Sequence, residues 1–156
     1  MTGIGNGSVV AQLDPDARSV RRRGGRAGLE TVYPPLRASA AQMRKALGAY
    51  LAGQALESGV AFDVVLAADE AFINAVGHAG GGAPIGVSAS VSATEASVEV
   101  RDGGSGFTFC RPDVGSVPDV RRPDGRGAFL MESMMDEVSV RSGRRGTSVR
   151  IVRHLA

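Results

Sequence analysis

The chain has 156 residues, of which 43% are hydrophobic and 22% charged, and these proportions are typical of one globular domain. No apolar stretch approaches the roughly 20 residues that cross a bilayer, and the first residues lack the apolar segment of a secretory signal. Cys110 is the single cysteine, which excludes an intrachain disulfide framework. The composition therefore predicts a cytoplasmic protein without membrane partners.

The net charge of +2 is unevenly distributed along the chain. Residues 1–28 hold five arginines and two aspartates, so this glycine-rich segment has a charge of +3 and the remainder −1. We expect residues 1–28 to form a flexible basic leader and residues 29–156 to form the folded domain. Such an arm can contact nucleic acid or an acidic partner, but a solvated tail is the commoner meaning of a short charge run, so no direct contact with nucleic acid is expected.

Residue periodicity predicts the element order β-α-α-β-β-loop-α-β-β. The expected strands cover residues 29–33, 85–93, 96–101, 138–141 and 147–152, and the expected helices cover residues 36–56, 62–79 and 125–135. Residues 102–124 show neither period and predict a long loop, a feature that is often functional in compact domains. Because helices come in groups and strands pair with their neighbours, the simplest packing is a two-layer α+β sandwich with helices on one face of a mostly antiparallel sheet.

The common phosphate-binding and catalytic motifs are absent. The only lysine, Lys45, is not preceded by the glycines of a P-loop, and G-x-G-x-x-G fails at each glycine cluster. His78, His154 and Cys110 have no metal-ligand spacing, and no Ser-His-Asp or Cys-His constellation can be assembled.

Three separate clusters of polar and glycine residues remain. In the second expected helix, Glu70, Asn74 and His78 are four residues apart and share one face. A carboxylate and an amide oxygen one turn apart can position a hydroxyl and ligate a hard cation such as Mg²⁺. Taken alone, however, the pattern is more often a solvated helix face.

The other two clusters follow an expected strand and the long loop. Asp102 at a strand end can accept a hydrogen bond from an exocyclic amine, and Gly104 and Gly106 leave bare backbone where a flat ligand can lie close. Gly125 and Gly127 open a helix, whose first amides are suited to phosphate. Each cluster alone is equally explained by a loop or hinge that needs glycine.

Together, the order and spacing of these clusters resemble the N, G1 and G2 boxes of the GHKL ATPase superfamily. In detail they are most similar to the anti-sigma factor serine kinases of bacteria. The stretches that carry the resemblance are 69–78, 100–107 and 125–131, with Gly146-Thr147 in the last strand. The resemblance implies the Bergerat ATP-binding fold, an α/β (α+β) sandwich whose helices cover one face of the sheet and whose ATP lies under a mobile lid.

The resemblance also implies roles for single residues. Asn74 would be the Mg²⁺ ligand, Glu70 the base that acts on the attacking hydroxyl, and Asp102 the acceptor of the adenine amine. The rest of the implied ATP site consists of His78, Gly104, Gly106, Gly125, Arg126, Gly127, Ala128 and Thr147.

The function implied by this resemblance is that of an ATP-dependent protein serine kinase and anti-sigma factor. With ATP and Mg²⁺ it would phosphorylate a serine of an anti-anti-sigma protein with a STAS domain, and it would also sequester a sigma factor and form a homodimer. The alternative is an ATP-binding regulatory protein that switches partners without phosphoryl transfer, although Glu70 favours the kinase. A detached histidine-kinase module would need a phosphoacceptor histidine, and neither His78 nor His154 lies on a suitable preceding helix.

Overall fold

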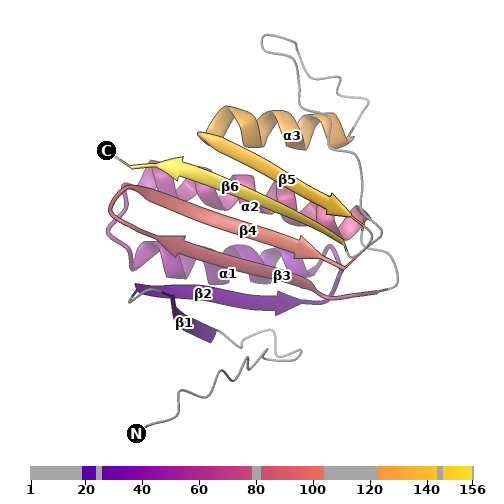
Figure 1. Cartoon of the computed structure of the whole chain (residues 1–156), viewed down its shortest axis with the longest axis horizontal. Coiled ribbons are helices and arrows are strands. Elements are labelled where there is room, and N and C mark those ends of the chain that lie inside the picture. The colour runs from indigo at the N-terminus through magenta and orange to yellow at the C-terminus, as the bar shows by residue number, and fades with distance from the viewer. Residues whose placement is uncertain (1–18, 24–25, 79–81, 104–122, 144–145, 156) are drawn as a thin grey trace, which may run out of the picture.

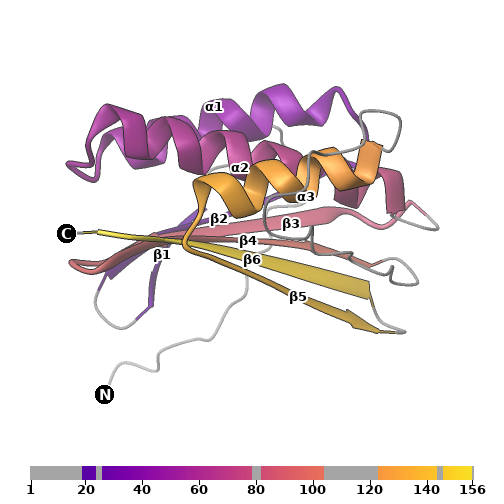
Figure 2. The same cartoon turned by 90° about the horizontal axis from the view of Figure 1, so that it is seen from above.

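The computed structural model describes residues 19–23, 26–78, 82–103, 123–143 and 146–155, without the side chains of residues 19–27, 78, 123–126 and 128. This part of the chain forms two layers, a sheet and a set of helices that cover one of its faces (Figures 1 and 2). The strands are β1 (Ser19–Arg23), β2 (Arg26–Tyr33), β3 (Ile85–Val91), β4 (Glu95–Asp102), β5 (Glu137–Gly143) and β6 (Gly146–His154). The helices are α1 (Ser39–Ala52), α2 (Ser58–His78) and α3 (Pro123–Met134).

Within the described residues the sheet has six strands in the order β1-β2-β3-β4-β6-β5, and every neighbouring pair is antiparallel. The predicted fold class is confirmed, because helices lie on one face of an antiparallel sheet. None of the described helices is long and apolar enough to cross a membrane.

The expected boundary between leader and domain needs correction. Residues 19–23 form β1, which pairs with residues 26–30 of β2, so the sheet begins inside the segment that the sequence assigned to the leader. The predicted edge strand over 29–33 is therefore the second strand of the sheet. The glycines and arginines of this hairpin concealed it, because they show no alternation of apolar side chains. Residues 1–18 lie outside the described part.

All three helices begin at places other than those expected, and α2 begins at Ser58, four residues before the predicted start. After Pro34-Pro35 the chain makes a turn in which Ser39 N–H donates to the Leu36 carbonyl, so α1 begins at Ser39 and not at residue 36. At the far end of the long loop, α3 begins at Pro123, two residues before the predicted start. Proline is well suited to the first helical turn because its missing N–H has no partner there in any case.

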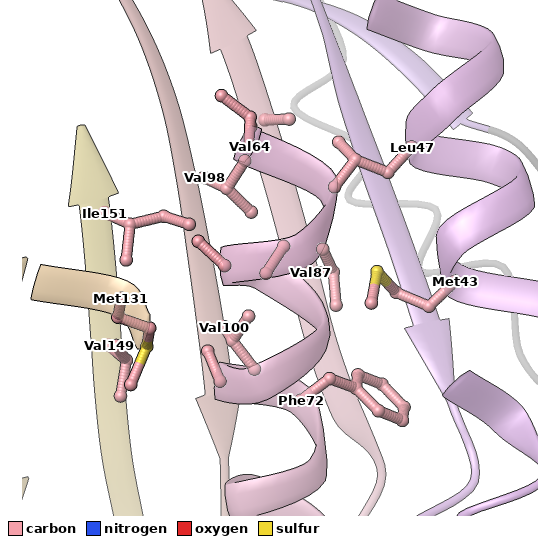
Figure 3. Close-up of a cluster of buried hydrophobic side chains, with 14 of the residues drawn as sticks. Met43, Leu47, Val64, Phe72, Val87, Val98, Val100, Met131, Val149 and Ile151 are labelled. Carbon is pink, nitrogen blue, oxygen red and sulfur yellow. The ribbon is translucent and has the colours of Figure 1, made fainter. Parts of the chain in front are cut away.

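The core lies between the two layers (Figure 3). Alternate residues of β3 and β4 point to the helices, and Val87, Val98 and Val100 are buried there beneath Val64 and Phe72 of α2. The Phe72 ring also meets Tyr33 of β2 edge to face, with 5.7 Å between the ring centroids. This packing fixes the rotation of α2 about its axis and so determines which residues of α2 face away from the sheet.

Candidate functional site

Helix α2 carries the first predicted cluster. Its small and apolar residues Ala67, Ala71 and Ala75 are buried, which lets the helix lie close to its neighbours. Glu70 and Asn74 are half-buried and lie one turn apart on this helix. The carboxylate and the amide are thus held by a packed helix and not by a loop.

Gly127 of α3 lies directly against this pair. A Cβ atom at Gly127 would be 2.9 Å from Glu70 Oε2 and 3.3 Å from Asn74 Nδ2. The first distance is shorter than a real Cβ contact, so the end of the Glu70 side chain would have to move if residue 127 carried a Cβ atom. The structure therefore brings together two clusters that are about 50 residues apart in sequence.

The third cluster lies at the ends of β4 and β6. Asp102 is the last residue of β4 and faces Thr147 of β6 in the register of the sheet, and both side chains are buried. The Thr147 hydroxyl also shares a hydrogen bond of 3.0 Å with that of Ser142. A depression of about 280 Å³ opens at this end of the sheet, and Asp102 and Thr147 contribute to its lining.

Two glycines that the predicted site did not include shape this end of the sheet. Gly146 has φ +124°, and a Cβ atom on it would overlap the carbonyl oxygen of Asp102. A Cβ atom on Gly103 would lie 2.9 Å from Cβ of Ala83. Because Ala83 lies two residues before β3, this contact places the end of β4 beside the segment that leads into β3.

All three clusters therefore meet at one end of the molecule. Figure 1 shows the tip of β4, the start of β6, the C-terminal end of α2 and the start of α3 on the same side. This end combines a carboxylate, an amide and glycines in close contact with their neighbours, and these are groups that can hold a nucleotide and a cation.

Residues 33–153 match the histidine kinase-like ATPase domain family. The chain belongs to this family. Membership confirms the predicted GHKL ATPase relationship and implies that this histidine kinase-like ATPase domain binds ATP. No curated protein matches the chain.

Two solved structures resemble the ATPase domain. The RsbU and RsbW domains of Rv1364c from Mycobacterium tuberculosis match with a TM-score of 0.60 and 22% identity over 86% of this chain and 34% of that one. The histidine kinase domain of the blue-light activated histidine kinase from Erythrobacter litoralis EL346 matches with a TM-score of 0.46 and 21% identity over 77% of this chain and 60% of that one. This chain thus spans less than two thirds of either protein, and the first likeness establishes a shared fold.

The remaining predicted site residues of the ATPase domain are only partly placed. Gly125, Arg126 and Ala128 lie in the first half of α3, and His78 is the last residue of α2, but their side-chain contacts lie outside the described part. Gly104 and Gly106 fall outside the described residues, as does most of the loop that would form the lid. Their roles stay predictions.

A magnesium ion is compatible with the described groups. The described residues contain no group of three or more His, Cys, Asp or Glu that could hold a metal on its own. Mg²⁺ in nucleotide sites needs fewer protein ligands, because it usually retains waters and binds phosphate oxygens beside one or two hard protein oxygens. The Asn74 amide oxygen beside the Glu70 carboxylate fits that requirement.

Proposed function

We propose that this ATPase domain is a protein serine kinase that phosphorylates a serine of an anti-anti-sigma protein with a STAS domain and also sequesters a sigma factor. The observation that carries the proposal is the position of Glu70, whose carboxylate lies beside Asn74 and against the backbone of Gly127. A protein that only bound ATP would not need a carboxylate at this point. The likeness of the fold to a structure that contains an RsbW domain supports the same assignment.

In the proposed reaction each group has a separate task. Asp102 binds the adenine amine, with Thr147 beside it, and the start of α3 binds the phosphates through backbone amides at Gly125 and Gly127. Asn74 would hold Mg²⁺, which would supply positive charge beside the phosphate oxygens. Glu70 accepts the proton of the serine hydroxyl. At the same time the serine oxygen bonds to the γ-phosphorus, and the bond between this phosphorus and ADP breaks.

The switch between partners follows from the chemistry of the product. A phosphate on the serine adds nearly two negative charges, which would break the contact between the anti-anti-sigma protein and the kinase. The kinase then becomes free to hold a sigma factor. We further propose that the protein acts in the cytoplasm and as a homodimer.

The test is transfer of labelled γ-phosphate from ATP, in the presence of Mg²⁺, to the small anti-anti-sigma proteins of the source cell. We expect label on a serine with the wild-type protein and a loss of about 100-fold or more with Glu70→Gln, because a general base contributes that much. Affinity for ATP, measured by calorimetry, should stay within a few-fold.

The neighbouring carboxylate provides a matched control. Asp69 forms an ion pair of 2.8 Å with Arg44 of α1. Its carboxylate therefore contacts α1, whereas that of Glu70 faces α3. Asp69→Asn makes the same chemical change one residue away and should retain transfer. Equal loss of ATP affinity and transfer in Glu70→Gln would contradict the assigned role, and ATP binding without any labelled product would indicate a nucleotide-gated binding protein.

A further inference from the structure

The face of the sheet that the helices leave uncovered has an uneven charge pattern. Because the strands are antiparallel and in known register, its outward residues form rows that run across the sheet. The row at the ATP-site end consists of Val32, Gly86, Arg101, Ser148 and Arg141 from β2, β3, β4, β6 and β5. This row contains two arginines and no carboxylate.

In the other rows of this face, the described basic side chains lie beside carboxylates. The next row contains Glu30, Glu99 and Arg150, and the Arg150 guanidinium pairs with Glu95 Oε1 at 3.1 Å. Farther along, His154 Nε2 lies 2.8 Å from Glu137 Oε1. Among the described side chains of this face, the excess positive charge therefore lies in the strand-end row.

The two arginines of that row are accessible and incompletely paired. The Arg101 side chain is 55% exposed, and its Nε lies 3.6 Å from Glu99, a carboxylate that also accepts a hydrogen bond of 2.6 Å from Ser148. Arg141 is exposed and has no ion pair or side-chain hydrogen bond with any other residue in the described part of the chain. Both guanidinium groups can therefore bind a further anion.

The surface between Arg101 and Arg141 forms part of the depression at the end of the sheet. Arg101, Arg141 and Ser148 contribute to the lining of the depression of about 280 Å³, together with Ser142 and Gly143. The carboxylate of Asp102, which also contributes to this lining, is buried. Gly143 has no side chain, and a Cβ atom there would meet no atom of the described residues within 4 Å. A planar guanidinium presents paired donors that match a carboxylate in a bidentate arrangement.

We propose that the strand-end row of Arg101 and Arg141 is a docking site for an acidic segment of a partner protein. A short acidic peptide fits better than a nucleic acid, because a phosphate backbone that crossed the sheet would meet the carboxylates of Glu99 and Glu30 in the next row. The site lies on the uncovered face of the sheet and does not depend on phosphoryl transfer. It gives the protein a second contact with a partner at the same end of the molecule as the ATP site.

The test uses the full-length protein and a fluorescein-labelled hexaglutamate peptide, with binding measured by fluorescence anisotropy at low salt. We expect Arg141→Glu to weaken binding at least about fivefold, because the charge reversal removes an attraction worth up to about that much for an exposed ion pair and also adds a repulsion. Arg101→Glu should have a similar effect. The control is Arg37→Glu, an exposed arginine between β2 and α1, outside this face, which should change binding less than about twofold.

Amide chemical shifts locate the peptide independently of the variants. Shifts should change most at Arg101, Arg141 and Ser148, and circular dichroism should show that all variants remain folded. The proposal is overturned by equal effects of Arg141→Glu and Arg37→Glu, by shift changes confined to the arginines of β1 and β2, or by no binding at millimolar peptide. Tighter binding of an oligothymidine of matched charge would assign the surface to nucleic acid instead and also overturn it.

Discussion

At Gly127 the lack of a side chain determines how closely α3 approaches α2. The Glu70 carboxylate and the Asn74 amide occupy the space into which a Cβ atom would project. A methyl group at this position would push α3 outward or rotate both polar side chains. Because α3 also supplies the predicted phosphate-binding amides, this single residue couples helix packing to the nucleotide site.

Gly127→Ala should therefore disturb the site more than the fold. We expect ATP affinity to fall because the Glu70 carboxylate must move, whereas the free energy of unfolding should change by less than about 1 kcal/mol, because the end of that side chain can rotate away and alanine is the better helix former. Chemical denaturation and calorimetry with ATP measure the two effects.

A glycine in an unobstructed helix position is the control. A Cβ atom on Gly48 of α1 would meet nothing within 4 Å, so Gly48→Ala should gain up to about 1 kcal/mol from the better helix propensity of alanine. If Gly127→Ala were as stable as Gly48→Ala and bound ATP normally, the contact between α3 and the Glu70–Asn74 pair would not constrain the site.

At the scale of the elements, Arg153 of β6 joins both helices of the site to the sheet. Its Nη1 donates to the carbonyl of Met134, the last residue of α3, and lies 3.4 Å from Asp63 Oδ2 of α2. A cation at a helix C-terminus is favourable because the final carbonyl groups lack partners within the helix. Arg153 therefore anchors the end of α3 opposite to the predicted phosphate-binding turn.

Arg153→Ala should lower the free energy of unfolding by about 1–3 kcal/mol, because it removes hydrogen bonds from a charged donor that is half-buried. Arg150→Ala, three residues earlier on the uncovered face, removes an exposed ion pair with Glu95 and should cost at most about 1 kcal/mol. Urea denaturation of both variants provides the comparison. Similar losses in the two would show that the Arg153 contacts add nothing beyond a surface ion pair.

Features that depend on residues close together in the sequence could be predicted for this molecule, whereas contacts between distant residues could not. Glu70 and Asn74 share a helix face by their spacing alone, and the strands around Val87 and Val98 follow from alternation. The contact of Gly127 with that face depends on the path of the chain through a long loop. The partners of Arg153 lie 90 and 19 residues away, so no local pattern could indicate them.

The backbone conformation of individual residues could not be predicted from the sequence either. The positive φ of Gly146 arises where β6 starts against the Asp102 carbonyl, a contact that exists only after β4 and β6 have paired. The resemblance to the ATPase family drew attention to Gly146-Thr147, but it did not supply this reason for the glycine.

For the whole molecule, β1 determines where the sheet ends. Residues 19–23 pair with residues 26–30, so they cover the edge of β2 that would otherwise expose unpaired backbone groups. The segment that looked like a leader from its charge thus contains a strand of the domain. A basic composition did not prevent pairing, because the backbone supplies the hydrogen bonds of a strand whatever its side chains are.

Two truncations separate the strand from the residues before it. Removing residues 1–28 deletes β1 and the start of β2, so we expect Tm to fall by more than about 4 °C and the exposed edge of β2 to promote self-association. Removing residues 1–18 leaves all of these strands intact and should shift Tm by less than about 2 °C. Thermal denaturation with light scattering measures both effects. Equal Tm values for the two truncations would mean that β1 contributes no stability and would restore residues 1–28 as a leader outside the fold, whereas a fall confined to the longer truncation places the start of the domain at β1.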